Sequence, residues 1–415
     1  MKQAQLSKGR CRLCDNDLQH SFVDLGKSPL CETYLTASEL EQGESFYPLD
    51  TLVCEQCFLV QVKEYVAPSD IYSDYPYFSS YSQSWLAHAK RYCETVTERF
   101  QLNTDSRVIE IASNDGYLLQ NFVKQKVQCL GIEPAANVAK VAIQNNVPTT
   151  VKFFGCDTAQ DVSASFGKAD LLIGNNVLAH VPDLRDFIKG MQILLAENGV
   201  ITMEFPHLMR LMQETQYDTI YHEHFSYLSL LTVQTAFANY GLDIFDVEAL
   251  PSHGGSLRIY AKHASNQQQA ILPSVGAIIE QELEYGLDKI DTYLRFESQV
   301  CESKWQLLEF LINAKREGKK VVGYGAPGKG NTLLNYCGIR SDLLEYTVDI
   351  SPHKQGKFTP GTHIPIYAPE HIMQAQPDYV LILPWNLAKE ISTQMADIRK
   401  WGGQFVVPIP TVHII

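Results

Sequence analysis

Short apolar runs alternate with segments of helical periodicity through residues 105–262 of the chain. Such alternation predicts a parallel sheet whose faces are covered by helices. Two further apolar runs, near residues 243–247 and 257–261, follow each other without a helix between them and would close the sheet. The four earlier runs, which we expect to form its parallel strands, cover residues 108–111, 127–132, 171–173 and 200–205.

A second alternating region follows a polar, glutamine-rich piece at 264–270 and a long helical stretch at about 275–318. Residues 1–70 show almost no helical periodicity, and an aromatic and serine-rich stretch leads into a helix expected at 85–100. We therefore predict a small module at 1–70, an α/β domain at 71–263 that includes this lead-in, and a C-terminal α/β domain at 264–415. The strands expected in the last domain cover residues 320–324, 346–349, 379–383 and 404–407.

Composition narrows the class of protein. The 415 residues carry 34 basic and 47 acidic side chains, a net charge of −13, which disfavours binding to nucleic acid or to anionic membranes. The chain shows no apolar run of about eighteen residues, and its first residues lack the apolar core of a signal peptide. We expect a cytoplasmic protein without a membrane segment, and both a monomer and a homodimer remain open.

Two Cys-x-x-Cys pairs, Cys11 with Cys14 and Cys54 with Cys57, lie in the N-terminal module. Four thiolates complete a tetrahedral zinc site and leave no position for water, so we predict a structural zinc ion. The alternatives are four unrelated buried thiols, or a redox pair. Neither pair opens a helix after a strand, which argues against the redox pair.

Two carboxylates follow the first two strands of the predicted domain. Glu110 ends the first strand before a tight turn, and about twenty residues later Glu133 ends the second, where an acid can bind ribose hydroxyls. That acid also suits NAD, but the turn lacks the three-glycine fingerprint, and Asp115 at the helix start would repel a pyrophosphate. The ligand should have a neutral or cationic centre, as S-adenosylmethionine does.

Asn175 and Asn176 follow the next expected strand and precede the sequence HVPD at 180–183. In this order and spacing the signals predict a class I (Rossmann-like) methyltransferase domain, with a generic Rossmann-like domain as the alternative. The predicted cofactor-binding residues are Glu110, Ala112, Asn114, Asp115, Glu133, Asn175 and Asn176.

The densest group of titratable residues is the segment YHEHFSY at 221–227, just beyond the strand that ends near 205. Histidines next to a carboxylate and a phenol suit general acid–base catalysis. A metal site would need a further ligand, and single histidines can also cap or pack. Replacing His222 should cost much less than replacing His224 if His222 points away, as alternate neighbours on an extended segment would. Tyr75, Tyr77 and Ser79 either line the same cleft or pack at a hinge.

A glycine-rich loop at 323–332 follows a strand and opens a helix. Its glycines, its lysine Lys329 and the free amides of the helix start predict an anion site for a diphosphate, to which Lys354 and Lys357 can add positive charge. The alternative is a tight turn without a ligand.

These motifs together resemble the C-methyltransferases of nucleotide-linked deoxysugars, including the C-3 enzymes of the tetronitrose and mycarose pathways. The resemblance extends over nearly the whole chain, with two departures: Ala112 replaces a usual glycine, and Gly328 a common alanine. The segments that carry it are the paired cysteines, SNDG at 113–116, HVPD at 180–183, YHEHFSY at 221–227, HGGSLR at 253–258 and GYGAPGKGNTLLN at 323–335.

The resemblance implies methylation at C3 of a 4-keto-deoxyhexose linked to dTDP or a similar nucleotide, through an enolate. His224 is the expected base, Glu223 and Tyr221 orient it or the substrate, and His180 and Tyr75 donate to substrate oxygens. The alternatives are an O- or N-methyltransferase on a nucleotide sugar, or a non-catalytic nucleotide-sugar-binding scaffold. The expected substrate-binding residues are Tyr77, Ser79, His253, Tyr324, Ala326, Lys329 and Asn331.

Overall fold

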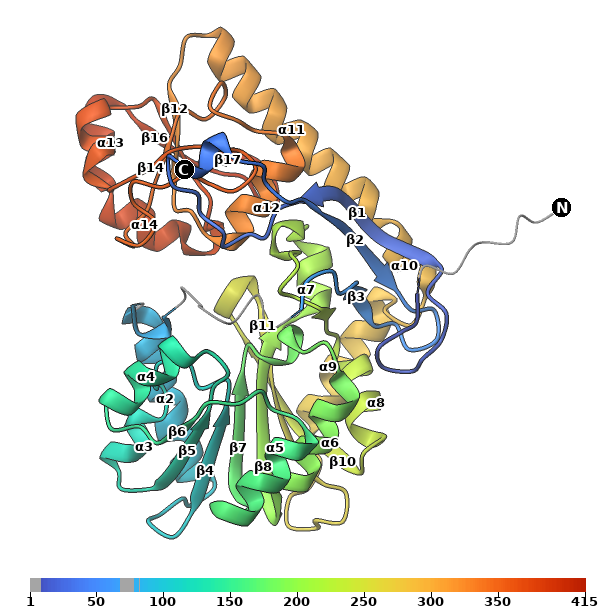
Figure 1. The fold of residues 1–415 in the computed structure, drawn as a ribbon. Coiled ribbons are helices and arrows are strands. Elements are labelled where there is room, and N and C mark those ends of the chain that lie inside the picture. Colours follow the sequence, from blue (N-terminus) through green and yellow to red (C-terminus); the bar gives the residue numbers. More distant parts are fainter. Residues whose placement is uncertain (1–8, 68–77, 82) are drawn as a thin grey trace, which may run out of the picture.

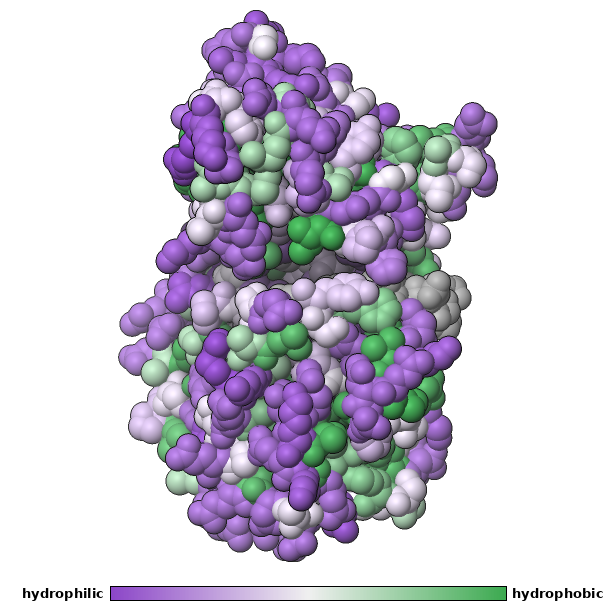
Figure 2. All heavy atoms as spheres, turned by 90° about the vertical axis from the view of Figure 1, so that its left-hand side faces the viewer, coloured by the Kyte–Doolittle hydropathy of each residue, from purple (hydrophilic) through white to green (hydrophobic). Residues whose placement is uncertain are grey.

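The computed structural model describes residues 9–67, 78–81 and 83–415 of the chain, so Tyr75 and Tyr77 lie outside the described residues. Figure 1 shows two α/β bodies, one above the other, with strands β1 and β2 of the N-terminal module along their side. The space-filling view shows that the surface is hollowed between the two bodies (Figure 2). None of the helices in the described ranges combines the length and the apolarity needed to cross a membrane.

The lower body is built on a seven-stranded sheet in the order β10-β11-β8-β7-β4-β5-β6. Strand β11 is antiparallel to both neighbours, and the other neighbouring pairs are parallel. The strand order reverses between β4 and β7, which makes their carboxyl ends a ligand-binding crevice. This arrangement confirms the predicted class I fold. The strands are β4 (Arg107–Ile111), β5 (Gln128–Ile132), β6 (Thr149–Thr150), β7 (Ala169–Asn175), β8 (Leu195–Pro206), β10 (Leu242–Leu250) and β11 (Ser256–His263).

Helices cover both faces of this sheet (Figure 1), as the alternating pattern predicted. They are α2 (Gln83–Arg99), α3 (Gln120–Lys124), α4 (Ala136–Gln144), α5 (Cys156–Ser165), α6 (Leu184–Leu194) and α8 (Leu230–Ala238). The apolar side chains of α7 (Leu208–Gln213) instead share a core with the N-terminal module and the upper body. Short 3₁₀ turns carry several polar residues: η1 (Glu39–Glu41), η2 (Ser79–Tyr81), η3 (Leu178–His180), η4 (Tyr217–Thr219), η5 (Ser252–Gly254), η6 (Trp385–Leu387) and η7 (Ala396–Trp401).

The upper body holds a six-stranded sheet in the order β14-β13-β12-β15-β16-β17, parallel except for β17, which confirms the predicted C-terminal Rossmann-like domain. Strands β14 and β17 were not predicted, because two residues are too short to show a period. The elements are β12 (Val321–Tyr324), β13 (Thr347–Val348), β14 (Ile366–Tyr367), β15 (Tyr379–Ile382), β16 (Gln404–Val407), β17 (His413–Ile414), α12 (Gly328–Cys337), α13 (Glu370–Ala375) and α14 (Ala388–Gln394).

The long helical stretch that connects the two bodies along the chain is divided into α9 (Pro273–Tyr285), α10 (Ile290–Leu294) and α11 (Phe296–Arg316). Gly286 ends α9 in the left-handed conformation, at φ 92°, which glycine adopts without the steric cost of a Cβ. Helix α11 then packs on the N-terminal module, where Phe296 stacks on Phe22 of β1 at 4.5 Å between ring centroids.

The N-terminal sheet consists of β1 (His20–Ser28), β2 (Tyr47–Val53), β3 (Val60–Val62) and a fourth strand, β9 (Ser226–Tyr227), from the middle of the chain. Gln61 pairs with Ser226, so the end of the YHEHFSY segment completes the sheet of the zinc module. The module also reaches the upper body, because Leu35 and Phe358 exchange backbone hydrogen bonds of 3.0 and 2.8 Å. The N-terminal module therefore contacts both α/β bodies.

Candidate active site

The carboxyl ends of β4, β5 and β7 gather buried polar side chains. Glu110, Glu133 and Asn175 are all buried there, one at the end of each strand or just beyond it. Several buried atoms in this region have no hydrogen-bond partner among the described residues: Glu110 Oε2, Ser113 Oγ, Asp115 Oδ1, Asn175 Oδ1, Asn175 Nδ2 and Asn176 Oδ1. Because native interiors rarely leave such atoms unpaired, they mark a place where a polar ligand binds.

The turn after β4 is shaped by three residues of positive φ: Ala112 at 55°, Asn114 at 51° and Gly116 at 79°. Glu133 holds this turn, since its carboxylate accepts hydrogen bonds from the amides of Asn114 at 2.9 Å and Ala135 at 2.8 Å. The carboxylate is thereby fixed at the mouth of the crevice.

The side chains of Asn114 and Asp115 also hold η2. Asn114 Oδ1 accepts a hydrogen bond from the Ser79 amide at 2.9 Å, and Asp115 Oδ2 accepts one from the Ser80 amide at 3.1 Å. The second Asp115 oxygen remains without a partner, as noted above. The predicted substrate residue Ser79 is thus placed directly over the cofactor turn.

Electrostatics favour a ligand that donates hydrogen bonds or carries positive charge. Burial raises the pKa of Glu110 well above its ordinary value, and the neighbouring carboxylates of Glu133 and Asp115 raise it further. Burial also raises the pKa of Glu133, although its two amide donors oppose the change. The hydroxyls and the ammonium group of S-adenosylmethionine meet this demand, so the residues present fit this cofactor.

The segment at 221–225 forms a turn, so the expectation of an extended segment was wrong. The His224 amide donates to the Tyr221 carbonyl at 2.9 Å, and the Phe225 amide donates to the Ala179 carbonyl at 2.7 Å. The Phe225 carbonyl in turn accepts from the Val62 amide at 3.1 Å. The turn is therefore held between η3 and strand β3 of the N-terminal module.

His224 has a defined tautomer. Its Nδ1 lies 2.8 Å from the Thr219 carbonyl, which can only accept, so Nδ1 carries the proton and Nε2 keeps its lone pair. Burial lowers the pKa of His224 well below its ordinary value, and the neighbouring His180 lowers it further. The His224 ring lies 4.6 Å from the His180 ring and 4.0 Å from the Tyr221 ring, measured between centroids. The His224 imidazole is therefore neutral at physiological pH.

The other two polar residues of the turn face elsewhere. His222 donates from Nε2 to the Pro48 carbonyl at 3.2 Å. Glu223 lies against Cys31, whose Sγ is 3.7 Å from Oε1, and burial raises the pKa of Glu223 to about 8. The hydrogen bond that orients His224 therefore comes from Thr219, a residue the sequence did not indicate, because any residue supplies a backbone carbonyl.

His180 and His253 complete a group of three histidines. Burial lowers the pKa of each to about 4, and His180 hydrogen-bonds the backbone of Glu223. His253, in η5, lies 3.1 Å from the side-chain nitrogen of Asn176 and edge-on to the Trp85 ring. The fold thus joins the HVPD, YHEHFSY and HGGSLR segments beside the cofactor crevice.

The glycine-rich loop makes contacts that the sequence did not indicate. The Ala326 amide donates to Asp349 at 2.7 Å, and the Ala326 carbonyl accepts from Lys354 at 2.8 Å and from the Tyr34 hydroxyl at 2.5 Å. Asn331 donates to the Cys31 carbonyl at 2.6 Å. The loop is therefore bound to the N-terminal module through Ala326 and Asn331, while Tyr324 ends the buried strand before it.

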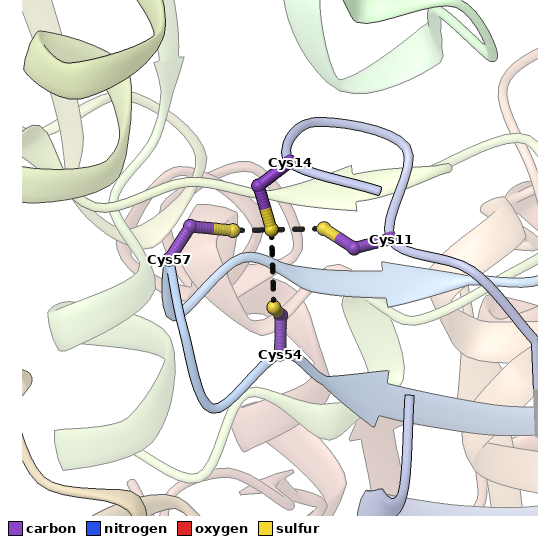
Figure 3. A group of neighbouring side chains, drawn as sticks. All are labelled: Cys11, Cys14, Cys54 and Cys57. Atoms are coloured by element: carbon purple, nitrogen blue, oxygen red, sulfur yellow. Dashed lines mark hydrogen bonds between the residues drawn. The ribbon is translucent and has the colours of Figure 1, made fainter. Parts of the chain in front are cut away.

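The four cysteines of the N-terminal pairs converge, and their sulfur atoms all lie within 4.8 Å of one another. Cys11 and Cys57 approach to 3.5 Å, as do Cys14 and Cys54, and Figure 3 shows all four side chains pointing inward. A zinc ion bound to four thiolates at about 2.3 Å separates them by about 3.8 Å. The geometry fits a closed structural zinc site.

Arg12, between the first two zinc ligands, links the four-cysteine site to the segments that carry His180 and His224. Its guanidinium donates to the Pro182 carbonyl at 3.1 Å and to the Val62 carbonyl at 2.5 Å. It also lies over the Phe225 ring, 5.4 Å from the centroid. The zinc knuckle therefore contacts both the HVPD segment and the YHEHFSY segment.

Comparison with known proteins agrees with this organisation. Three family models match the chain: "Putative zinc binding domain" at 11–72, "Methyltransferase domain" at 85–247 and "C-methyltransferase C-terminal domain" at 251–410. C-methyltransferase NovU of Streptomyces niveus is 34% identical over 405 residues, which cover 98% of this chain and 96% of NovU. This chain belongs to the C-methyltransferase family. It is an S-adenosylmethionine-dependent methyltransferase with a four-cysteine zinc-binding site.

Solved methyltransferases also match part of the chain. A SAM-dependent methyltransferase from Anabaena variabilis is 14% identical, with a TM-score of 0.35, and the match covers 43% of this chain and 86% of that one. A second, from Clostridium acetobutylicum, is 12% identical with a TM-score of 0.35, covering 43% and 91%.

Proposed function

We propose that this C-methyltransferase methylates C3 of a 4-keto-deoxyhexose linked to dTDP or a similar nucleotide. A carbon atom becomes a nucleophile only after it loses a proton, and a C–H next to a ketone can lose one to form an enolate. The observation that carries the proposal is the fixed tautomer of His224, whose Nε2 lone pair is available to a base-catalysed reaction. The relative NovU is named a C-methyltransferase, and the resemblance to deoxysugar enzymes suggests the class of substrate.

In this proposal the crevice at β4, β5 and β7 holds S-adenosylmethionine, which supplies an electrophilic methyl group. Glu133 accepts hydrogen bonds from the ribose hydroxyls, as an acid after the second strand does in related folds. The unpaired atoms of Glu110 and Asp115 accept from the other donors of the cofactor. Asn175 and Asn176 bind beside them, and the positive φ of Ala112 and Asn114 brings backbone amides to the same crevice.

On the substrate side, His224 takes the C3 proton at Nε2 while the Thr219 carbonyl holds Nδ1–H in place. Tyr221 packs on the ring and limits its rotation. His180 and His253 line the cleft as donors to sugar oxygens. Ser79 contacts the substrate from the lead-in segment, and Tyr75 and Tyr77, outside the described residues, remain expected substrate contacts. Glu223, whose carboxyl lies against Cys31, orients the substrate. The nucleotide binds the C-terminal domain near Tyr324, Ala326 and Asn331.

The test is His224→Asn, which removes the base and keeps a polar side chain of similar size. Turnover should fall by roughly 10²–10⁴, the usual effect of losing a general base, whereas binding of cofactor and nucleotide sugar should hardly change. Exchange of the C3 proton with solvent deuterium should be lost as well, because the base performs that step. His222→Asn is the matched control, since His222 faces the Pro48 carbonyl and should retain exchange.

Two results would contradict the proposal in different ways. If His224→Asn keeps wild-type exchange but loses methyl transfer, the base is another residue. If the wild-type enzyme neither exchanges the C3 proton nor forms a carbon–carbon bond with any 4-keto nucleotide sugar, C-methylation at C3 is wrong. Mass spectrometry of the products then identifies O- or N-methylation in its place.

A further inference from the structure

The side chain of Lys329, in the glycine-rich loop, is held by two neighbouring residues of the C-terminal domain. It lies in the first turn of α12 and donates from Nζ to Asn386 Oδ1 at 2.9 Å. The ammonium also lies over the Trp385 ring, 4.7 Å from the centroid. Two side chains from η6 therefore hold a cation in a defined position, and an aromatic face stabilises such a cation.

Trp385 connects this cation to the histidines of the lower body. Its indole Nε1 donates to Asp218 Oδ2 at 2.7 Å, and Asp218 is fully buried in η4, next to the Thr219 that holds His224. A Cβ built on Gly254 would lie 2.6 Å from the indole ring, so Trp385 also touches the residue after His253. One ring thus contacts the segments that carry both histidines.

The pKa shifts around Lys329 agree with its position near Asp218 and the histidines of the lower body. Burial lowers the pKa of Lys329, and the carboxylate of Asp218 opposes that change. Burial raises the pKa of Asp218 to about 6, and Lys329 opposes that change in turn. The charge of Lys329 also lowers the pKa of both His224 and His253, which agrees with a position of the ammonium near these two neutral imidazoles.

We propose that Lys329 binds the C4 carbonyl oxygen of the sugar and stabilises the enolate oxygen, with Asp218, Trp385 and Asn386 as positioning residues. The inference rests on the proposed C3 methylation. The C3–H bond breaks and its proton goes to His224 Nε2, while the electron pair forms a C3–C4 double bond and the carbonyl electrons move to oxygen. When C3 then bonds to the methyl carbon, the carbonyl re-forms and the methyl–sulfur bond breaks, leaving its electron pair on sulfur.

The surroundings favour an enolate oxygen over a diphosphate as the partner of Lys329. The carboxylate of Asp218, hydrogen-bonded to the ring that lies against Lys329, opposes the lowering of the pKa of this lysine by burial, and two more carboxylates stand near the same loop. Asp349 occupies the Ala326 amide, and Glu32 is paired with Lys354 at 3.5 Å. A diphosphate would bring two negative charges to this group, whereas an enolate develops a single one, and only during the reaction. Charge that develops in a preorganised, water-poor site gains most from a fixed cation.

The central test is Lys329→Met, which keeps the length of the side chain and removes the ammonium. Exchange of the C3 proton and methyl transfer should both fall by about 10²–10³, the usual effect of losing a group that stabilises an oxyanion. Affinity for dTDP alone, which lacks the hexose, should stay within about threefold of the wild type, because the keto group is absent. Lys304→Met is the control. Lys304 lies on α11, and its ammonium also lies over an aromatic ring, that of Tyr336. It should leave exchange unchanged.

The positioning residues are tested by Trp385→Phe, which keeps a ring under Lys329 and loses the hydrogen bond to Asp218. The maximal rate should fall by about tenfold or more with little change in KM, because the contact matters to the transition state and not to ground-state binding. The pH–rate profile should also shift, because Asp218 would lose its donor. A purely structural role would lower stability and leave the pH–rate profile of the folded fraction unchanged.

If Lys329→Met does not fold, Lys329→Arg is the second variant. It keeps the charge in a different geometry and should still lose exchange of the C3 proton.

The possible outcomes distinguish enolate stabilisation by Lys329 from diphosphate binding, and both from a failure of the proposed function. Weaker dTDP binding by about tenfold or more, with exchange preserved in Lys329→Met, overturns the inference and assigns the cation to the diphosphate. Unchanged exchange and unchanged dTDP affinity overturn it as well. Absence of C3 exchange in the wild-type enzyme would instead refute the proposed function itself, before any variant is compared.

Discussion

A buried carboxylate at the end of β8 offers the most direct test of the energetics of this site. Glu204 is fully buried and accepts hydrogen bonds from Arg258 at 2.5 Å, from His88 at 3.0 Å and from the Ser252 hydroxyl at 2.8 Å. Its carbonyl also accepts the Asn176 amide at 2.7 Å. Glu204 therefore connects helix α2 and the His253-bearing turn η5 to the cofactor crevice.

The contribution of Glu204 to stability follows from its pKa. Burial alone would raise the pKa of Glu204, but the hydrogen bond from His88 and the charge of Arg258 outweigh it and hold the pKa at about 2, below the ordinary 4.5. At 1.36 kcal/mol for each pH unit, this shift corresponds to about 3 kcal/mol of stability. Because the pKa is lowered on folding, this stability is present above about pH 4.5 and is lost as the pH falls toward 2.

Glu204→Gln should therefore lower the free energy of unfolding by about 3–5 kcal/mol at pH 7, since it leaves the buried Arg258 without its main counter-ion. The assay is urea unfolding at pH 7 and again near pH 3, with midpoints and slopes compared. Glu248→Gln is the matched control. Glu248 also pairs with Arg258, at 3.4 Å, but is half-buried, so its loss should cost less than about 1 kcal/mol.

The difference between Glu204→Gln and the wild type should shrink near pH 3, because Glu204 takes up a proton there in the unfolded chain while it stays mostly ionised in the folded one, which lowers the stability of the wild type. A cost below about 1 kcal/mol at pH 7, or a cost that is the same at both pH values, would refute this account of Glu204.

Three further predictions concern the cofactor turn and the metal. Glu133→Ala should weaken S-adenosylmethionine binding by about 1.5–3 kcal/mol in calorimetry, the usual value of hydrogen bonds to a charged group; unchanged affinity would place the ribose elsewhere. Ala112→Gly should raise the free energy of unfolding by about 0.5–1 kcal/mol in urea, because relief of the positive φ of 55° exceeds the entropy that glycine adds to the unfolded chain. A lower midpoint would show that the turn is not strained. Metal analysis should find one zinc ion per chain, lost in Cys11→Ser and Cys57→Ser together with stability; a fully stable, metal-free variant would exclude a structural role.

Much of the fold could be predicted from local pattern. The period of apolar residues identified the strands β4, β5, β7 and β8, because a buried parallel strand must be apolar on both faces. Polar residues at the carboxyl ends of those strands, such as Glu110, Glu133 and Asn175, lie at one edge of the sheet, since the carboxyl ends of parallel strands meet there. The cysteine spacing likewise predicted the zinc site, because two short knuckles suffice for four thiolates.

Only the tertiary structure decided what each residue of the candidate site touches. The sequence indicated His224 but not the Thr219 carbonyl that sets its tautomer, because a backbone carbonyl is the same in every residue. Glu223 was expected beside His224, yet its carboxyl lies against Cys31, which is 192 positions away along the chain.

Long-range pairing explains these differences. Gln61 meets Ser226 across two strands, and Trp385 meets Asp218 between the two bodies, although nothing in the local sequence of either partner specifies the other. Periodicity and spacing report which residues are buried and which element they form, since these depend on near neighbours. Which buried groups become partners depends on how whole elements pack, and that is settled by the free energy of the complete chain.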